Sequence, residues 1–247
     1  MCRHLAYVGS PITLQSLLID PVHSLVQQSW APRFQISGIM NVDGFGVGWY
    51  QRDSSGQTPA RYRRDRPIWT DAGFSDLARV TSSPAILAAV RSASPGLPFG
   101  EAACAPFAHE RWLFSLNGSL EGYPDKAAPL LDHLDSARLL QMEAATDSAL
   151  LWLLVRAQLD GGAALGDALG SVARLTTAHC DGRFNLLLTD GVEIAATVIG
   201  NSLFWRTTSD SIVVASEPHD DDEGWTRVPD QSLLTASLVD GVTVVSL

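Results

Sequence analysis

Cysteine is scarce in this sequence, which has 247 residues and three cysteines, Cys2, Cys104 and Cys180. A sparse and odd number of cysteines argues against a framework of disulfide bonds. Such frameworks belong to oxidising compartments, whereas free thiols persist in reducing ones. The sequence therefore predicts an unbridged protein, and we expect a cytoplasmic location.

Long apolar runs are also lacking. Residues 5–8 are too few for the hydrophobic region of a secretory signal peptide, and Gly9, Ser10 and Pro11 follow them directly. No run approaches the roughly 20 apolar residues that a membrane-spanning helix needs. We therefore expect neither a signal peptide nor an association with a membrane.

Positive charge is in short supply. Lys and Arg together number 17 against 27 Asp and Glu, which gives a formal net charge of −10. A protein that binds phosphate backbones needs a basic face, so nucleic acid is not an expected partner. The one basic cluster is expected to lie on a solvated loop or a strand edge; it comprises Arg61, Arg63, Arg64 and Arg66.

The chain does contain strand and helix patterns, arranged in separate blocks. Apolar runs predict strands in the first half at residues 5–8, 45–50, 85–90 and 112–116. Short helices are expected to begin near Thr13 and Pro21 and to end at Ile19 and Trp30, and residues 54–56 are expected to form a loop.

The centre of the chain is helical and the last quarter returns to strands. Thr146 is a suitable N-cap for a helix over 147–159, and apolar spacing predicts a second helix over 165–175. Six strands are predicted after it, at 184–188, 193–199, 203–206, 211–215, 233–238 and 242–246. Segregated blocks of this kind favour an α+β fold with antiparallel sheets. No linker or repeat is visible, so residues 1–247 are expected to form one domain.

Cys2 is the residue with the clearest chemical potential, because it directly follows Met1. If Met1 is removed, one residue carries both a thiol and a free α-amine. An α-amine titrates near ~7.7–8.0, so part of it is neutral at pH 7 and able to accept a proton. A nucleophile with an N-terminal amine as its base is a known solution for acyl transfer. The plainer interpretation is that Cys2 only begins a strand.

Three polar residues stand at the ends of apolar segments and complement such a nucleophile. Arg91 offers a planar fork for a carboxylate, and Asp147 can hold an ammonium group. Asn117 and Gly118 can present a side-chain N–H and a backbone N–H to one oxygen, as in an oxyanion hole. Together these groups would hold an α-amino acid whose side-chain carbonyl is attacked, such as glutamine or a γ-glutamyl amide.

Each of these residues also has a structural interpretation. Asn-Gly is a common hairpin turn, Asp147 can complement the dipole of its helix, and Arg91 can form an ion pair. A different class of protein is also open, in which cysteines and histidines bind a metal or serve a structural role. Its candidate ligands are Cys2, His4, Cys104, His109, His179 and Cys180.

Several motifs resemble class II glutamine amidotransferases, which belong to the N-terminal-nucleophile hydrolases. They are Cys2 after Met1, the stretch 91–96 (RSASPG), the stretch 115–118 (SLNG) and the stretch 146–148 (TDS). The stretches 1–5 (MCRHL), 41–50 (NVDGFGVGWY) and 216–218 (SEP) with the acidic residues 220–223 are similar to one branch of that family. This branch comprises the γ-glutamyl-hercynylcysteine sulfoxide amidohydrolases of ergothioneine biosynthesis.

The resemblance implies a four-layer αββα sandwich of two antiparallel sheets. It implies Cys2 as nucleophile with its own amine as base, and Asn117 with Gly118 as the oxyanion hole. Arg91, with Ser94 nearby, would bind the glutamyl α-carboxylate, and Asp147 the α-ammonium. The products would be glutamate and hercynylcysteine sulfoxide, formed without a metal or cofactor.

One departure from the family pattern is visible, because Leu116 stands where the family usually has a histidine before Asn-Gly. An alternative function within the family is a glutaminase subunit that delivers ammonia to a separate synthase. The acidic residues 220–223 are expected to form a solvated loop near the mouth of the site. This loop or the segment 94–106 is the expected moving part.

Overall fold

The computed structural model describes residues 2–51 and 58–247. Met1 and the loop expected at residues 54–56 lie outside the described residues. The strands of sheet A are β1 (Arg3–Thr13), β2 (Phe45–Trp49), β3 (Ala60–Arg64), β4 (Ser82–Val90), β9 (Phe204–Thr207), β10 (Ser211–Ala215) and β11 (Thr226–Arg227). Those of sheet B are β5 (Phe107–His109), β6 (Trp112–Leu120), β7 (Gly182–Thr189), β8 (Glu193–Val198), β12 (Ser232–Ser237) and β13 (Gly241–Ser246).

Both sheets are antiparallel, as the sequence predicts. The strand order in sheet A is β11-β9-β10-β1-β4-β2-β3, and in sheet B it is β13-β12-β8-β7-β6-β5. Strand β1 therefore lies inside sheet A, between β4 and β10. Arg3 pairs with Val90 at one end of this strand, which sets the register of the chain's first residues against the end of β4.

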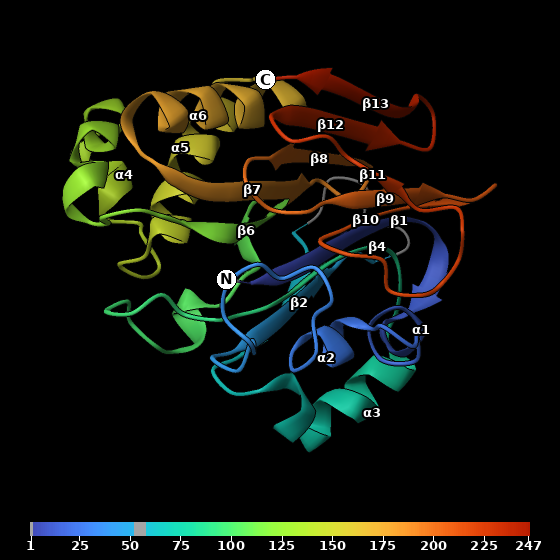
Figure 1. The fold of residues 1–247 in the computed structure, drawn as a ribbon. Helices are drawn as coiled ribbons and strands as arrows, with labels where there is room; N and C mark the ends of the chain where they lie inside the picture. Colours follow the sequence, from blue (N-terminus) through green and yellow to red (C-terminus); the bar gives the residue numbers. More distant parts are fainter. Residues whose placement is uncertain (1, 52–57) are drawn as a thin grey trace.

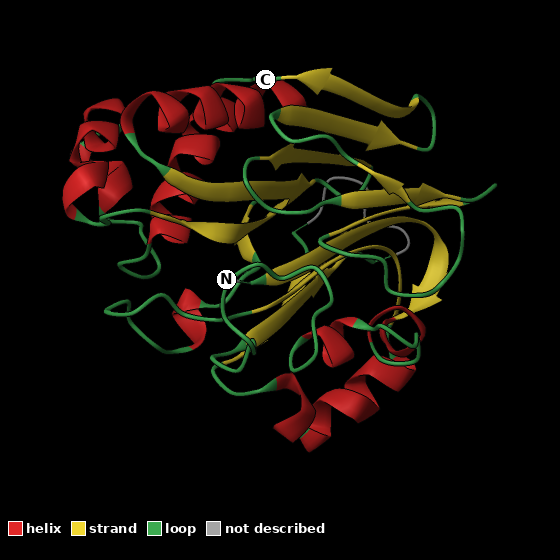
Figure 2. Cartoon of the chain, in the orientation of Figure 1, coloured by secondary structure: helices red, strands yellow, loops and turns green. Residues whose placement is uncertain are grey.

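Helices cover the outer face of each sheet (Figures 1 and 2). The helices α1 (Leu14–Leu18), α2 (Leu25–Gln28) and α3 (Ala72–Val80) lie against sheet A. The helices α5 (Asp147–Asp160) and α6 (Leu165–His179) lie against sheet B, with α4 (Ser136–Leu139) beside them in the ribbon view. The result is the expected αββα sandwich. No helix of the described residues is long and apolar enough to cross a membrane.

The core divides into three layers because side chains alternate along each strand. In β1, Leu5 and Tyr7 pack against the helices beneath sheet A, whereas Ala6 and Val8 point to the space between the sheets. In β6, Leu113 points to the same inner space, and its neighbours on the strand pack against α5. This alternation decides which polar residues meet between the sheets.

Two expectations about local structure are wrong. Residues 21–30 contain a helix only at Leu25–Gln28, because the stretch before it is a turn in which Ser24 N–H donates to Pro21 O (2.9 Å) and the Ser24 side chain caps the helix. Asn117 and Gly118 do not end a strand, because β6 continues through Leu120. Two elements were not predicted. Arginines dominate strand β3, and helix α3 has only nine residues.

The basic cluster lies on a strand edge, as expected. Strand β3 is the last strand of sheet A and carries Arg61, Arg63 and Arg64. Arg61 and Arg63 both pair with Glu143, at 3.4 and 2.8 Å. Two arginines of the cluster are therefore bound to the segment before α5, and Arg64 pairs instead with Asp71 and Glu101.

Candidate active site

Strand alternation places Cys2, Arg91 and Asn117 towards the space between the two sheets. Cys2 precedes β1 by one residue. Because side chains alternate, it lies on the same side of the strand as Ala6, which faces the space between the sheets. Arg91 follows β4 and lies on the same side of it as the inner residue Leu87. Asn117 likewise lies on the same side of β6 as the inner residue Leu113. Three residues that are far apart in the sequence thus converge, because β1 and β4 are neighbours in sheet A and β6 of sheet B contacts both strands.

Cys2 is half-buried and lines a small pocket of about 30 Å³. Its Sγ lies 3.9 Å from the carbonyl oxygen of Ser92, and the pocket also contains Arg91, Leu116 and Ser148. Small-molecule sites typically have volumes of about 300–1,000 Å³. A γ-glutamyl group therefore needs a wider pocket than this conformation provides.

The guanidinium of Arg91 is positioned by the backbone and retains one donor group for a ligand. Its backbone N–H donates to Gly44 O (2.7 Å), and its Nη2 donates to Pro98 O (2.9 Å). Arg91 is only 8% exposed, and its Nη1 has no hydrogen-bond partner among the residues that the structure describes. A buried, unsatisfied cationic donor beside Cys2 is suited to an anionic group such as a carboxylate.

Asp147 lies in the first turn of α5 and connects this helix to the end of β6. The helix is capped by the Thr146 side chain, which accepts from Ala149 N–H (3.2 Å). The Asp147 carboxylate accepts from the backbone N–H groups of Leu120 (3.1 Å) and Ser148 (2.8 Å). Burial raises the pKa of Asp147, while these hydrogen bonds and the charge of Arg91 act in the opposite direction. A carboxylate has about four acceptor positions, so it can still accept from a ligand.

Asn117 and Gly118 lie inside strand β6, where the backbone is unusual. Gly118 has φ +153°, and a Cβ at this position would lie 1.7 Å from Arg183 O, so no other residue fits there. The Asn117 side chain is fully buried, and its Nδ2 donates to Ser216 Oγ at 3.2 Å. One of the two N–H donors of this amide is thereby engaged, and the other is available to an oxygen.

Ser94 lies in the loop after β4 and is half-buried. Its carbonyl oxygen accepts from Leu97 N–H at 3.1 Å, which forms a turn in this loop. Ser94 does not line the small pocket around Cys2. Its expected role next to the glutamyl carboxylate remains a prediction.

A hydrogen-bond network around Ser216 joins the two sheets beside Cys2, and sequence reasoning did not identify it as part of the site. Ser216 Oγ accepts from His4 N–H (3.0 Å) and from Asn117 Nδ2, and Ser216 N–H donates to His4 O (2.9 Å). The stretch 216–218 was noted in the sequence, but no local pattern shows that it lies beside β1. Ser216 fixes the position of Asn117 relative to β1, the strand that directly follows Cys2.

His4 is fully buried between the sheets, with its Nδ1 3.1 Å from Ser115 Oγ. Burial, together with the charge of Arg3, lowers the pKa of His4 to about 3. The ring is therefore neutral at physiological pH.

Within the described ranges, no three His, Cys, Asp or Glu residues are grouped so that they could hold a metal ion. The metal-binding alternative therefore has no site among these residues.

The pKa of His4 predicts how stability depends on pH. The unfolded chain protonates His4 near 6.5 and the folded protein only near 3, so the free energy of unfolding falls as the pH falls from 6.5 towards 3. Between pH 7 and pH 4 this effect amounts to about 3 kcal/mol. His4→Asn is expected to be less stable than wild type at pH 7 but to lose less stability on acidification. Urea unfolding at a series of pH values measures the difference.

A matched control is His133→Asn, because His133 is exposed. This variant is expected to follow the wild-type dependence of stability on pH. An equal loss of stability in His4→Asn and wild type between pH 7 and pH 4 would show that the buried neutral imidazole is not responsible.

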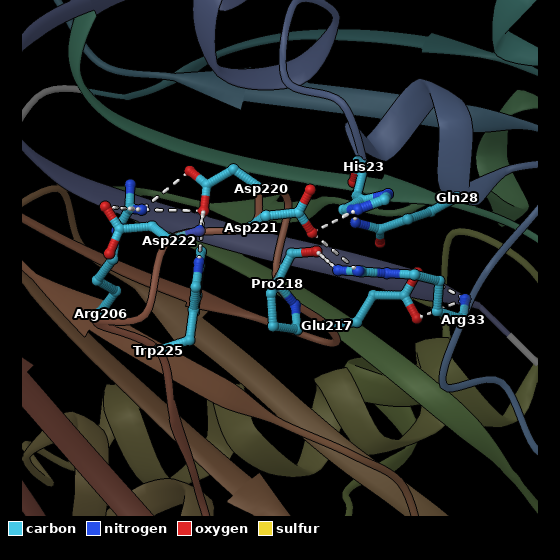
Figure 3. Close-up of polar contacts among 10 residues, drawn as sticks. All are labelled: His23, Gln28, Arg33, Arg206, Glu217, Pro218, Asp220, Asp221, Asp222 and Trp225. Carbon is cyan, nitrogen blue, oxygen red and sulfur yellow. Dashed lines mark hydrogen bonds and ion pairs between the residues drawn. The ribbon is translucent and has the colours of Figure 1, made fainter.

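The acidic residues after β10 form more contacts than the expected solvated loop (Figure 3). Asp221 lies 2.9 Å from His23 Nε2 and 3.4 Å from the guanidinium of Arg33. Asp220 accepts two hydrogen bonds from Arg206 and one from Trp225. Asp221, Asp222 and Glu223 are exposed, as expected of a solvated loop, but Asp222 also pairs with Arg206 at 3.3 Å.

Comparison with known proteins identifies the class that this fold and site define. A family model described as "Glutamine amidotransferases class-II" matches residues 16–205. The chain belongs to this family. A protein from Silicibacter pomeroyi described as a "glutamine aminotransferase class-II domain protein" has a similar structure, with a TM-score of 0.67 and 24% identity over 99% of both chains.

Curated relatives give a narrower comparison. The chain is 38% identical over 234 residues, 95% of each protein, to the γ-glutamyl-hercynylcysteine sulfoxide hydrolase of Mycolicibacterium smegmatis. It is also 38% identical over 247 residues to the protein of the same name from Mycobacterium tuberculosis, covering 100% of this chain and 97% of the relative.

Proposed function

We propose that this chain is a hydrolase that cleaves the γ-glutamyl amide bond of γ-glutamyl-hercynylcysteine sulfoxide. The observation that carries the proposal is the 38% identity, over nearly the whole of both chains, to relatives that have this activity in their names. We further propose that residues 1–247 act as one domain and that the enzyme works in the cytoplasm. Its three cysteines are free, in keeping with a reducing compartment.

In the proposed reaction, the Cys2 thiolate attacks the γ-carbonyl carbon after Met1 has been removed and the α-amine has taken up the thiol proton. The oxyanion of the tetrahedral intermediate accepts from the Asn117 side chain and Gly118 N–H. The amine then donates the proton to the leaving nitrogen, and the C–N bond breaks to give a γ-glutamyl thioester. Water hydrolyses the thioester to glutamate and restores the thiol.

The glutamyl part is held by groups of opposite charge. The proposal assigns its α-carboxylate to Arg91, with Ser94 close by, and its α-ammonium to Asp147. Support comes from the unsatisfied Nη1 of Arg91 among the described residues and from the Asp147 carboxylate, which burial keeps from water. No metal or cofactor has a role in this sequence of steps.

The test is a glutamate-release assay on untagged protein whose N-terminus is defined by mass spectrometry. With γ-glutamyl-hercynylcysteine sulfoxide as substrate, kcat/KM is expected to exceed that with glutamine by a large factor. A preference for glutamine would favour the other function in this family, a glutaminase that supplies ammonia to a separate synthase. Full activity with Met1 still attached would rule out the α-amine as base.

A further inference from the structure

A groove of about 720 Å³ lies near the candidate active site but shares no residue with the small pocket around Cys2. Its walls are the segment 33–36, the turn 200–202 after β8, and the segment 227–230. This volume falls within the range of about 300–1,000 Å³ that is typical of small-molecule sites. The proposed mechanism assigns it no function.

The groove is connected to the reaction centre on both sides. Gln35, in one wall, accepts from the Nε of Arg3 at 3.3 Å, and Arg3 directly follows Cys2. Asn201, in the other wall, donates to the backbone oxygen of Asn117 at 2.9 Å. The groove is therefore one hydrogen bond away from Arg3, the residue after Cys2, and one hydrogen bond away from Asn117 of the candidate oxyanion hole.

Sheet topology puts the groove on the opposite side of Cys2 from the glutamyl-binding residues. Strand β1 has β4, which ends at Arg91, on one side and β10, which leads to Ser216, on the other. The groove lies on the β10 side, beside the end of β8, whereas the small pocket contains residues from the end of β4 and the start of α5. An amide with its carbonyl at Cys2 and its glutamyl part near Arg91 would extend its leaving group away from β4, towards the side of β1 on which the groove lies.

The side chains of the groove suit a zwitterionic group. Arg227 is exposed and has no ion pair with any residue in 2–51 or 58–247, and its guanidinium lies 6.0 Å from the ring centre of Phe204. Phe34 packs edge-on against Phe204 at 5.1 Å and remains 38% exposed. Asp230 uses one carboxylate oxygen for Gly200 N–H (2.9 Å). A cation, an aromatic ring and a carboxylate thus border one cavity.

The segment after β10 holds the Phe34 wall of the groove in place, and Figure 3 shows its contacts with the neighbouring Arg33. The fully buried Glu217 accepts from the backbone N–H groups of Arg33 (3.0 Å) and Phe34 (2.7 Å). The Arg33 guanidinium donates to Pro218 O at 2.9 Å. The position of Phe34 therefore depends on the residues that follow the Ser216 network.

We propose that this groove binds the leaving group of the substrate, with Phe34, Arg227 and Asp230 as specificity-determining residues. The proposal rests on the proposed hydrolase function. Hercynylcysteine sulfoxide carries a trimethylammonium group and carboxylates. A quaternary ammonium is attracted to an aromatic face and an anionic oxygen, which Phe34 and Asp230 supply. A carboxylate matches the fork of Arg227.

The first test compares Phe34→Ala and Arg227→Ala with wild type on two substrates, γ-glutamyl-hercynylcysteine sulfoxide and glutamine. Glutamine releases ammonia, which is too small to reach the groove. Each variant is expected to lower the ratio of kcat/KM for the sulfoxide to that for glutamine about tenfold, mainly through KM. Arg79→Ala, which removes an exposed arginine of α3, is the matched control and should leave the ratio unchanged. Equal losses on both substrates would overturn the proposal.

A second test separates this inference from the function on which it rests. The affinity of hercynylcysteine sulfoxide for Cys2→Ala protein is measured by calorimetry, with and without Phe34→Ala or Arg227→Ala. We expect each groove substitution to weaken binding about tenfold. Unchanged affinity would exclude the groove as the leaving-group site even if wild type hydrolyses the sulfoxide. Conversely, wild-type protein that binds this compound through the groove but releases no glutamate would contradict the proposed hydrolysis alone.

Discussion

Cys2→Ala is expected to lower glutamate release from γ-glutamyl-hercynylcysteine sulfoxide by at least about 10⁴-fold, because the covalent route through a thioester is lost. What then remains is catalysis by the oxyanion hole and by positioning of the substrate. Steady-state assays measure the loss. Mass spectrometry of wild type quenched in acid is expected to detect a γ-glutamyl adduct on the first peptide, and the variant should lack it.

Cys180→Ala is a suitable control for this experiment. Cys180 is also nearly buried, with its Sγ 3.4 Å from Lys126 O, and it lies at the end of α6, away from the candidate site. Its replacement is expected to leave glutamate release near the wild-type level. Retention of more than a few per cent of activity by Cys2→Ala would eliminate Cys2 as the nucleophile.

Asn117→Ala is expected to have the next largest effect, a loss of about 10²–10³ in kcat, which corresponds to about 2.7–4 kcal/mol of transition-state stabilisation. The oxyanion forms only after attack, so KM should change little. Asn117→Asp keeps the shape of the side chain but replaces the donor by an acceptor, and a loss at least as large is expected. Both constants come from glutamate-release kinetics.

Loss of the bond from Asn117 to Ser216 could also weaken the junction between the sheets. Thermal unfolding distinguishes this effect from catalysis. Ser216→Ala removes the same hydrogen bond but leaves the amide donor in place, so its kcat should lie well above that of Asn117→Ala. A kcat for Ser216→Ala as low as that for Asn117→Ala would show that Asn117 acts by holding the fold and not as an oxyanion donor.

The α+β class with antiparallel sheets was predictable from the sequence because most of the strands are short apolar runs bounded by turn residues, whereas the four-layer arrangement followed from the family resemblance. The runs at 85–90 and 211–215 coincide with β4 and β10 to within a few residues. The conformation of Asn117 and Gly118 was harder to predict. Asn-Gly is common in turns, which suggested that the strand ends there, whereas β6 stays extended through Leu120. Packing against Arg183 decides that conformation, and Arg183 is distant in the sequence.

Residue chemistry alone was enough to nominate the residues of the candidate site, and their roles stay predictions. Cys2, Arg91 and Asn117 do turn towards the same space, and Asp147 is close enough to Arg91 for their charges to interact. The supporting residues were not predictable in the same way. Gln35 and Asn201 reach the site through side-chain hydrogen bonds to residues 32 and 84 positions away in the sequence, and such contacts leave no periodic signal in it.

The position of β1 between β4 and β10 has a consequence for biosynthesis. A nascent chain emerges N-terminus first. Strand β4, on one side of β1, is therefore synthesised early, whereas β10, on the other side, is synthesised much later. His4 and Ser216, which hold one another across that junction, are 212 positions apart. Contacts of such separation form slowly. The ribosome therefore has to synthesise the chain through Ser216 before the candidate catalytic centre can form, and a product terminated earlier would carry Cys2 without β10, its neighbour on one side of β1.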